Sequence, residues 1–413
     1  MVSRGRCRLC AAPLDLSVID LGSQPLANDL APSAASALAA ERYPLHARAC
    51  SSCWLVQLDA TVPPSSMFSD YAYLSSYSST WLAHVEDYAT WAVESFGLGE
   101  GSTVVEIGSN DGCLLECFAR RDIDVLGVDP AENLAGVAAE RGVRTVVDFF
   151  GRRVAEALVA DGVRPDLVVA NNVFAHVPDL LDVVEGFAVL AAAGAAITIE
   201  VPHLLATIDG LAFDAVYHEH VSYFSLATAR RALATGGLEV VDVVSLPTHG
   251  GSLRLVVRPS GSVAPSASVD ALLAREHECG LEDAAVYERF AERARACIEG
   301  LAAFLAEAAG EGGVMGYGAP AKATVLLNAA GATSAHVTAI ADRNPRKVGR
   351  FVPGTGVPIV PVDELRARRP GRVLVLPWNL EQEIAAELAD VRASGAELLV
   401  AVPHLRSVVA TEP

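Results

Sequence analysis

The order of apolar and polar residues separates the chain into a short N-terminal part and two longer parts. Residues 1–69 show little helical periodicity, whereas beyond residue 100 short apolar runs alternate with amphipathic helical stretches. The predicted strands of the middle part lie within 102–112, 125–129, 166–173 and 195–203, with helices at 113–121 and 134–142. Such alternation is typical of βαβ units and a parallel sheet.

The same alternation returns near the end of the chain. Late strands, a long helical region and a second strand, glycine turn and helix are predicted at 238–247, 251–260, 265–310 and 312–331, followed by strands at 337–345 and 372–378. We therefore predict an α/β protein with a small N-terminal module (1–69), a central Rossmann-like domain (70–260) and a second Rossmann-like α/β domain (261–413).

Composition and charge narrow the range of partners. With 413 residues, of which 52% are hydrophobic, the chain can bury several cores. Its formal net charge of −19 repels polyanions, which argues against nucleic acid and anionic membrane surfaces as partners. Any phosphate group must therefore be bound locally. Since no stretch resembles a signal peptide or a membrane span, we expect a cytoplasmic protein. We also expect a monomer.

Four of the eight cysteines form two CxxC pairs, Cys7 with Cys10 and Cys50 with Cys53. This spacing lets thiolates from two tight turns reach one tetrahedral zinc ion, so we predict a structural Zn²⁺ site. A thioredoxin-like redox pair is the alternative. Because the pairs are further apart than the ~15–20 residues of a compact ribbon, we expect the Ala-rich segment 31–46 to loop out. The cysteines that we expect to be ordinary buried thiols are Cys113, Cys117, Cys279 and Cys297.

The first strand-to-helix turn of the central domain, EIGSNDG, is acidic. It places Glu106, Gly108, Asn110 and Asp111 at the end of the sheet where open α/β folds bind ligands. Asp129 ends the next strand, where a carboxylate can accept the hydroxyls of a ribose. Carboxylates suit a cationic cofactor without phosphate, such as S-adenosylmethionine. An NAD-dependent oxidoreductase or epimerase would also use a ribose-binding aspartate and is the alternative.

Half of the ten histidines lie in the second half of the central domain: His176, His203, His218, His220 and His249. An imidazole can remove a proton from a moderately acidic carbon near neutral pH. In the segment YHEH, Glu219 could orient such a base and Tyr217 could donate a hydrogen bond to an oxyanion. The HxH spacing also allows a metal site, and a purely structural cluster is a third interpretation.

These motifs occur together in one family. The two CxxC pairs, EIGSNDG, NNVFAHVPD, YHEHVSYFS, HGGSLR and GYGAPAKA appear in an order that resembles the S-adenosylmethionine-dependent sugar C-methyltransferases. The resemblance covers essentially the whole chain. It implies a zinc-binding module, a cofactor domain and a C-terminal domain that helps to bind the nucleotide sugar.

The resemblance also implies a reaction, the methylation of carbon 3 of a TDP-linked 4-keto-6-deoxyhexose. In this family such sugars are often 2-deoxy and in some members 3-amino, and they become branched deoxysugars on antibiotics. Methylation of carbon 5, which also flanks a keto carbon, is the alternative within this chemistry. A protein that binds a nucleotide sugar or a partner without turnover is a hypothesis of another class.

By position in the family motifs, His220 takes the C3 proton, while Tyr217, Glu219 and His176 orient the base or stabilise the enolate. The residues implied to bind the cofactor are Glu106, Gly108, Asn110, Asp111, Asp129, Asn171 and Tyr71, with Tyr73 beside Tyr71. Those implied to bind the substrate are His218, His249, Gly250, Gly251, Ser252, Tyr317 and Lys322, the last at a helix N-terminus that favours an anion. For the basic segment 343–350 we favour a solvated loop over a second phosphate contact.

Overall fold

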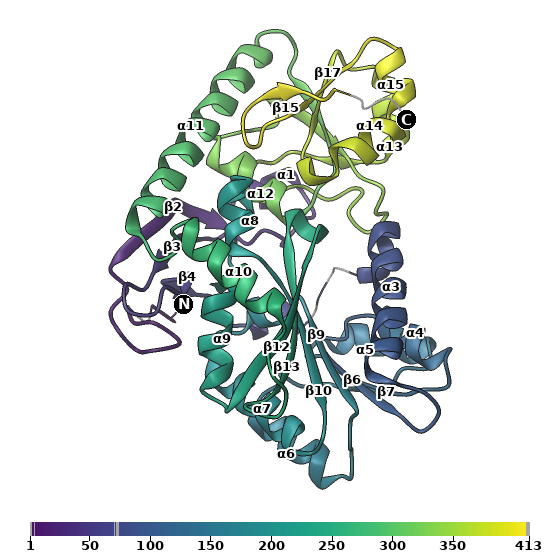
Figure 1. The fold of residues 1–413 in the computed structure, drawn as a ribbon. Coiled ribbons are helices and arrows are strands. Elements are labelled where there is room, and N and C mark those ends of the chain that lie inside the picture. The colour runs from purple at the N-terminus through teal and green to yellow at the C-terminus, as the bar shows by residue number, and fades with distance from the viewer. Residues whose placement is uncertain (1, 4, 70, 72–73, 410–413) are drawn as a thin grey trace.

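The largest sheet of the protein occupies the lower half of the molecule in Figure 1, and seven strands of the described residues form it. The computed structural model describes residues 2–3, 5–69, 71 and 74–409. The strand order is β12-β13-β10-β9-β6-β7-β8; strands from β10 to β8 run parallel, and β13 pairs antiparallel with β10 and β12. The strands are β6 (Thr103–Ile107), β7 (Asp124–Val128), β8 (Thr145–Val146), β9 (Leu167–Asn171), β10 (Ala196–Pro202), β12 (Leu238–Leu246) and β13 (Ser252–Pro259).

The burial of these strands follows from their sequences. Along β9, Val168 and Ala170 pack in one apolar core, and Val169 packs in another on the opposite face. Helices α6 and α7 cover the first face, and α3 and α4 cover the second. A sheet covered on both faces requires continuous apolar runs, which is the pattern seen in the sequence. The helices of this part are α3 (Ser79–Phe96), α4 (Cys113–Ala119), α5 (Glu132–Glu140), α6 (Arg152–Ala160), α7 (Leu180–Ala192), α8 (Leu204–Asp209) and α9 (Leu226–Ala234), with 3₁₀ turns η2 (Phe174–His176), η3 (Phe213–Ala215) and η4 (Thr248–Gly250).

The N-terminal part forms an antiparallel sheet in the order β11-β4-β3-β2, whose strand β11 comes from the middle of the chain. The prediction that segment 31–46 loops out was wrong. Residues from Arg42 onward form β3, because alternate residues of that strand, Leu45, Ala47 and Ala49, are buried. The elements are β1 (Val2–Ser3), β2 (Leu16–Pro25), α1 (Ala34–Leu38), β3 (Arg42–Ala49), β4 (Val56–Leu58), β5 (Ala60–Thr61), α2 (Ser65–Phe68), η1 (Ser75–Tyr77) and β11 (Ser222–Tyr223).

The C-terminal part contains a second sheet with the order β16-β15-β14-β17-β18-β19, parallel except for β19. Helix α11 runs from this sheet along the side of the molecule to β2, so the N-terminal and C-terminal parts share one apolar core (Figure 1). The elements are α10 (Ala267–Glu278), α11 (Ala284–Ala309), β14 (Val314–Tyr317), α12 (Ala321–Ala329), β15 (Val337–Ala341), β16 (Ile359–Val360), α13 (Val362–Arg368), β17 (Arg372–Val375), η5 (Trp378–Leu380), α14 (Glu381–Glu387), α15 (Ala389–Ala393), β18 (Glu397–Val400) and β19 (Arg406–Ser407).

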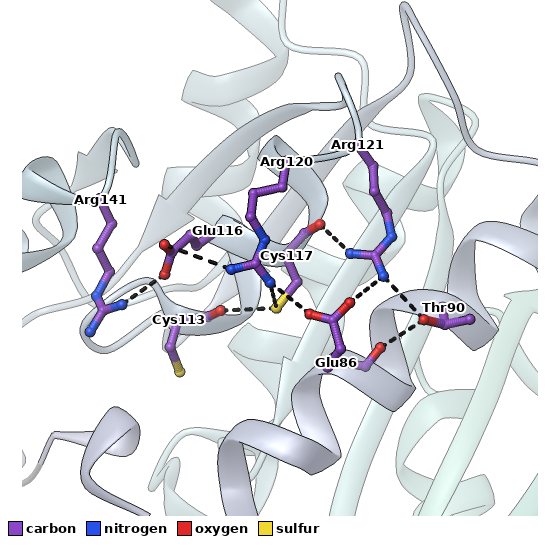
Figure 2. Close-up of polar contacts among 8 residues, drawn as sticks. All are labelled: Glu86, Thr90, Cys113, Glu116, Cys117, Arg120, Arg121 and Arg141. Carbon is purple, nitrogen blue, oxygen red and sulfur yellow. Dashed lines mark hydrogen bonds and ion pairs between the residues drawn. The ribbon is translucent and has the colours of Figure 1, made fainter. Parts of the chain in front are cut away.

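Ion pairs join α3 to the end of α4, the helix that follows the acidic turn (Figure 2). Glu86 of α3 accepts hydrogen bonds from Arg120, at 2.6 Å, and from Arg121. Glu116 of α4 pairs with Arg141 at 2.7 Å. Because these side chains are partly exposed, the pairs contribute little to stability, at most about 1 kcal/mol each. The pairs of Glu86 hold α3 against the end of α4, and the pair of Glu116 holds α4 against the end of α5.

The predicted domain limits at 69/70 and 260/261 stay a prediction. Contacts link the parts on either side of both limits. Strand β11 of the central part belongs to the N-terminal sheet, and α10 of the C-terminal part packs against β12. Cys113, Cys117 and Cys297 are buried, as predicted, but Cys279 is exposed where α10 ends. Among the described residues, no helix is both long and apolar enough to cross a membrane.

Candidate active site

A cavity of about 400 Å³ opens at the carboxyl ends of the central parallel strands. Its lining comes from all three parts of the chain: Asn28 from the N-terminal part, Asn110 and His176 from the central part, and Lys322 from the C-terminal part. The ends of parallel strands are where open α/β sheets bind ligands. The cavity is therefore the candidate active site.

The turn after β6 brings its backbone close to the cavity. Gly108 has a φ of 68°, and a Cβ there would overlap the side chain of Val173, so the position requires glycine. The N–H groups of Asn110 and Ala131 each donate a 2.8 Å hydrogen bond to a different carboxylate oxygen of Asp129. These bonds fix the Asp129 carboxylate directly after β7, and Asp129 lines the cavity.

The carboxylates that line the cavity at the ends of β6 and β7 favour a positively charged ligand. Burial raises the pKa of Glu106 well above its ordinary value, and the charges of Asp129 and Asp111 raise it further. Burial likewise raises the pKa of Asp129. Glu106 Oε2 and both polar side-chain atoms of Asn171 are buried without a hydrogen-bond partner among the described residues. A cation with hydroxyl and amino groups would satisfy these groups, as S-adenosylmethionine would.

Asp111, expected among the cofactor-binding residues, has a different position. It is fully buried and is not among the described residues that line the cavity. Its Oδ2 accepts the N–H of Ser76 at 3.1 Å and lies 3.9 Å from Arg141. Asn110 Oδ1 accepts the N–H of Ser75 at 3.0 Å. The acidic turn thus also holds the segment that precedes α3.

His220 is held as a neutral base beside the cavity. Its Nδ1 lies 3.0 Å from the carbonyl oxygen of Ala215, which can only accept, so Nδ1 carries the hydrogen and Nε2 the lone pair. The hydroxyl of Tyr217 lies 2.8 Å from Nε2 and donates to it. Burial, and then the neighbouring His176, lower the pKa of His220 well below its ordinary value. The imidazole is therefore unprotonated at neutral pH.

His176, at the end of η2, faces the same space. Its ring centroid lies 4.7 Å from that of His220, in an edge-to-face arrangement. Burial lowers the pKa of His176 to about 4. Its Nδ1 is buried without a hydrogen-bond partner among the described residues. Two neutral imidazoles thus lie side by side, although they come from segments more than 40 residues apart in the chain.

Glu219 joins the N-terminal part to this site. Its Oε1 accepts a 2.7 Å hydrogen bond from Asn28 Nδ2, and its Oε2 accepts a 3.0 Å bond from the hydroxyl of Tyr71. Burial raises the pKa of Glu219, whereas the bonds from Asn28 and Tyr71 lower it. Tyr71 therefore contacts Glu219 and also lines the cavity. Tyr73, expected beside it, lies outside the described residues.

The turn between β12 and β13 forms another part of the cavity lining. His249, Gly250 and Gly251 line the cavity, and Asn172 Nδ2 lies 3.2 Å from His249 Nε2. Gly251 has a φ of 125°, and a Cβ there would overlap Ala206, so glycine is needed for the turn to close against α8. Trp81 of α3 also lines the cavity and lies 5.7 Å from His249, ring to ring.

Two lysines from the C-terminal part of the chain line the cavity. Lys322, in the first turn of α12, donates to Asn379 Oδ1 at 2.9 Å and lies 4.6 Å from the Trp378 ring. Lys347 donates to the carbonyl oxygen of Ala319 at 2.8 Å. Burial lowers the pKa of both ammonium groups. Our preference for a solvated loop at 343–350 was therefore wrong for Lys347, because the chain folds back toward the N-terminus of α12.

Three residues expected to bind substrate lie outside the lining found among the described residues. His218 is buried, with Nε2 3.3 Å from the carbonyl oxygen of Tyr43. Ser252 donates to the carbonyl oxygen of Thr248, and Tyr317 is buried within β14. Residues 217–220 form a turn, in which the His220 N–H donates to the carbonyl oxygen of Tyr217, so His218 and His220 do not share a face as they would in an extended strand. The two imidazoles therefore do not form one metal-ligand set.

The four cysteines of the CxxC pairs meet in the N-terminal part. Their sulfur atoms all lie within 4.8 Å of one another, with Cys7 and Cys53 3.4 Å apart and Cys10 and Cys50 3.5 Å apart. Tetrahedral Zn–S bonds of about 2.3 Å place sulfurs about 3.8 Å apart, so the cluster fits zinc. The hydrogen bond from Cys53 lowers the pKa of Cys7, which favours the thiolate that binds metal.

Comparison with curated proteins found a relative along the whole chain. C-methyltransferase NovU from Streptomyces niveus is 35% identical over 410 residues, which are 98% of this chain and 97% of NovU. The chain belongs to the same C-methyltransferase family. Family models divide this C-methyltransferase into a "Putative zinc binding domain" (7–68), a "Methyltransferase domain" (81–243) and a "C-methyltransferase C-terminal domain" (247–403). It is an S-adenosylmethionine-dependent methyltransferase with a zinc site, and not an oxidoreductase.

Other similarities are confined to parts of the C-methyltransferase. A ubiquinone biosynthesis O-methyltransferase from Methylobacterium sp. (strain 4-46) is 31% identical over 163 residues, 36% of this chain and 64% of that protein. Among solved structures, the magnesium protoporphyrin IX methyltransferase of Synechocystis PCC 6803 with bound SAM is 17% identical, with a TM-score of 0.33; the match covers 43% of this chain and 77% of that one.

Loss of one zinc ligand should unfold the N-terminal part of the C-methyltransferase. We expect about one zinc per chain by metal analysis, and loss of zinc with aggregation in Cys7→Ser, because binding to a structural site contributes folding free energy. Cys279→Ser, which changes an exposed thiol outside the cluster, should keep both zinc and solubility. Zinc retained at the wild-type level in Cys7→Ser would contradict the four-cysteine site.

The pH dependence of the C-methyltransferase should show the lowered pKa of its histidines. A base works only when it is unprotonated, and the pKa of His220 lies below its ordinary value of 6.5. We therefore expect kcat/KM to stay level through neutral pH and to fall only below pH 6.5, toward the pKa of about 4 of His176. A fall in kcat/KM on the acid side that is centred at or above pH 6.5 would contradict the prediction that the base has a lowered pKa.

The residues that the sequence analysis missed are mainly Asn28, Trp81 and Lys347. For Lys347 a signal was present, because it is one of two lysines in the sequence and lies in the basic segment 343–350, for which a phosphate contact was the alternative. For Asn28 and Trp81 there was none. Each lies far from the central motifs in the chain and reaches the cavity only through packing between parts.

Proposed function

We propose that this C-methyltransferase transfers a methyl group to carbon 3 of a TDP-linked 4-keto-6-deoxyhexose. The substrate class is a 2,6-dideoxy sugar, with or without a 3-amino group, of the kind that is attached to antibiotics. The observation that carries the proposal is the neutral His220, held through Nδ1 with its Nε2 lone pair beside the cavity. The full-length similarity to a C-methyltransferase is consistent with it.

The chemistry needs a carbon acid that histidine can deprotonate. A 4-keto group makes the hydrogens on its neighbouring carbons acidic, because the electron pair left behind becomes an enolate. In the proposed reaction, Nε2 of His220 takes the proton from carbon 3. A positioned general base contributes roughly 10²- to 10⁴-fold to the rate. His176 lies beside His220 and is also neutral, so His220 has no positively charged imidazole next to it when it takes the proton.

The oxygen that becomes negative must face donors that are already in place. Without substrate the hydroxyl of Tyr217 donates to Nε2 at 2.8 Å; in the proposed reaction it turns to the oxygen on the carbon next to the one deprotonated, which frees the Nε2 lone pair for the proton. Glu219, held by Asn28 and Tyr71, supplies an acceptor for a hydroxyl or amino group of the sugar. These residues orient the sugar ring relative to His220.

The methyl donor would lie at the other end of the cavity. Glu106, Asp129 and Asn171 line that end and carry the unsatisfied or cavity-facing polar groups. When bound, S-adenosylmethionine supplies an electrophilic methyl group on its sulfonium. Enclosure of both reactants in one cavity replaces a bimolecular encounter, which can contribute about 7–11 kcal/mol to lowering the barrier.

The nucleotide diphosphate would lie at the N-terminus of α12. Lys322 and Lys347 converge there from two segments, and the helix dipole adds a partial positive charge. In a chain of net charge −19, this local positive site explains how a polyanionic group could bind.

The test is incubation with methyl-labelled S-adenosylmethionine and a TDP-4-keto-2,6-dideoxyhexose, with and without a 3-amino group, in deuterated buffer. NMR that finds the labelled methyl on carbon 3 would support the proposal. A methyl on carbon 5 would correct the position and keep the mechanism. Deuterium exchange beside the ketone without methyl transfer would support the base but contradict this sugar as the methyl acceptor. Absence of both would contradict the proposed substrate.

A further inference from the structure

The catalytic segment is attached to the zinc-binding part of the chain. Strand β11, which begins two residues after His220, pairs with β4, so that Ser222 lies opposite Gln57 and Tyr223 opposite Val56. Leu58 N–H also donates to the carbonyl oxygen of Val221 at 3.1 Å. The residues that hold the base in place therefore include residues of another part of the chain.

We propose that Arg8, which lies between the zinc ligands Cys7 and Cys10, is a positioning residue for the pair His220 and His176. This rests on the function proposed above. Arg8 is only 6% exposed, and its Nη1 donates to the carbonyl oxygens of Leu58 at 2.9 Å and Val221 at 3.1 Å. One guanidinium thus joins a zinc loop, strand β4 and the residue that follows His220.

The backbone of Val221 links Arg8 to the segments that carry both histidines. Its carbonyl oxygen accepts from Arg8 and Leu58, while its N–H donates to the carbonyl oxygen of Ala175 at 2.9 Å. His220 precedes Val221 and His176 follows Ala175, so this one peptide pairing sets the distance between the two imidazoles. A shift of Val221 would change their 4.7 Å separation and the hydrogen bonds of His220.

The zinc cluster orients Arg8 through Gln57. Gln57 Nε2 donates to the sulfur of Cys7 at 3.1 Å, so its Oε1 faces Arg8 and accepts from the backbone N–H at 2.9 Å and from Nη1 at 3.2 Å. The amide has one donor end and one acceptor end, and both are used. Second-shell hydrogen bonds of this kind commonly orient residues around a metal. The N-terminal part thus stabilises the fold and also sets the position of the base.

The experiment compares Arg8→Met and Arg8→Lys with the control Arg231→Met in the full-length protein. Arg231 of α9 also binds the zinc-binding part, donating to the carbonyl oxygen of Cys53 at 2.8 Å, but it contacts no catalytic residue among the described contacts. Zinc content, S-adenosylmethionine affinity, kcat and KM are measured for each variant. The ¹⁵N chemical shifts of the histidine rings are measured without substrate, so that this arm does not depend on the sugar.

We expect Arg8→Met to keep zinc and cofactor affinity, and to lower kcat about 10- to 100-fold with KM little changed, because small displacements of a catalytic group have effects of this size. Arg8→Lys, which keeps the charge but replaces the planar guanidinium with a flexible ammonium, should lie between it and wild type. The Nδ1 and Nε2 shifts of His220 should move in both Arg8 variants, while those of His203, bound to Glu276, stay fixed.

The proposal is overturned if folded, zinc-loaded Arg8→Met keeps wild-type kcat and His220 shifts, or if Arg231→Met changes both equally. Should Arg8→Met fail to fold, the same criteria apply to Arg8→Lys. If wild type does not methylate the TDP-keto sugar, the proposed function fails. Movement of the His220 shifts in the Arg8 variants alone then still supports the positioning role, and unchanged shifts overturn it.

Discussion

Replacing His220 with asparagine should lower turnover by about 10²- to 10⁴-fold, the usual contribution of a general base. Asparagine is similar in size but cannot accept a proton from carbon. The change should leave S-adenosylmethionine binding intact, because the end of the cavity at which we propose that the cofactor binds is lined by the turn after β6 and by Asp129. Steady-state kinetics together with calorimetric titration of the cofactor would measure both effects.

Two further variants decide which imidazole is the base. His277→Asn, an exposed change on α10 away from the cavity, is the control and should keep wild-type turnover. His176→Asn should reduce turnover less than His220→Asn, because the contacts that fix a tautomer, to Ala215 and Tyr217, belong to His220. If His220→Asn kept turnover within about threefold while His176→Asn abolished it, the base would be His176.

Loss of the two lysines should weaken binding of the nucleotide sugar. We expect Lys322→Gln and Lys347→Gln each to raise KM about 10- to 100-fold, since a hydrogen bond to a charged group contributes about 1.5–3 kcal/mol. The affinity for S-adenosylmethionine should not change, because neither side chain lies at the acidic end of the cavity. Titration with TDP alone would give the same result without turnover.

Arg346→Gln is the matched control for the lysines. It removes the same charge next to Lys347 from an exposed side chain, which lies 6.0 Å from the ring of Tyr77. An equal loss of TDP affinity in Arg346→Gln would show a general electrostatic effect rather than a phosphate site.

Because the chain has two lysines, TDP should also protect it almost completely from lysine-specific modification, except at the α-amino group.

The fold could largely be predicted from local pattern. Strand β9 and its neighbours are continuous apolar runs, as a sheet covered on both faces requires, and the helices between them have clear periodicity. The N-terminal part was harder to predict. Segment 31–46 has little pattern that distinguishes a loop from a strand, and β3 forms because β2 and β4 are present on either side of it.

The sequence by itself determined the groups that lie close together along the chain: the CxxC pairs, the glycine turn with Glu106, and Tyr217 with His220. Their chemistry follows from spacing over a few residues. Only the tertiary structure decided that Asp111 turns away from the cavity, that His218 faces Tyr43, and that Lys347 joins Lys322. These outcomes depend on which distant segments pack together, and burial against those segments is what lowers the pKa values of the histidines.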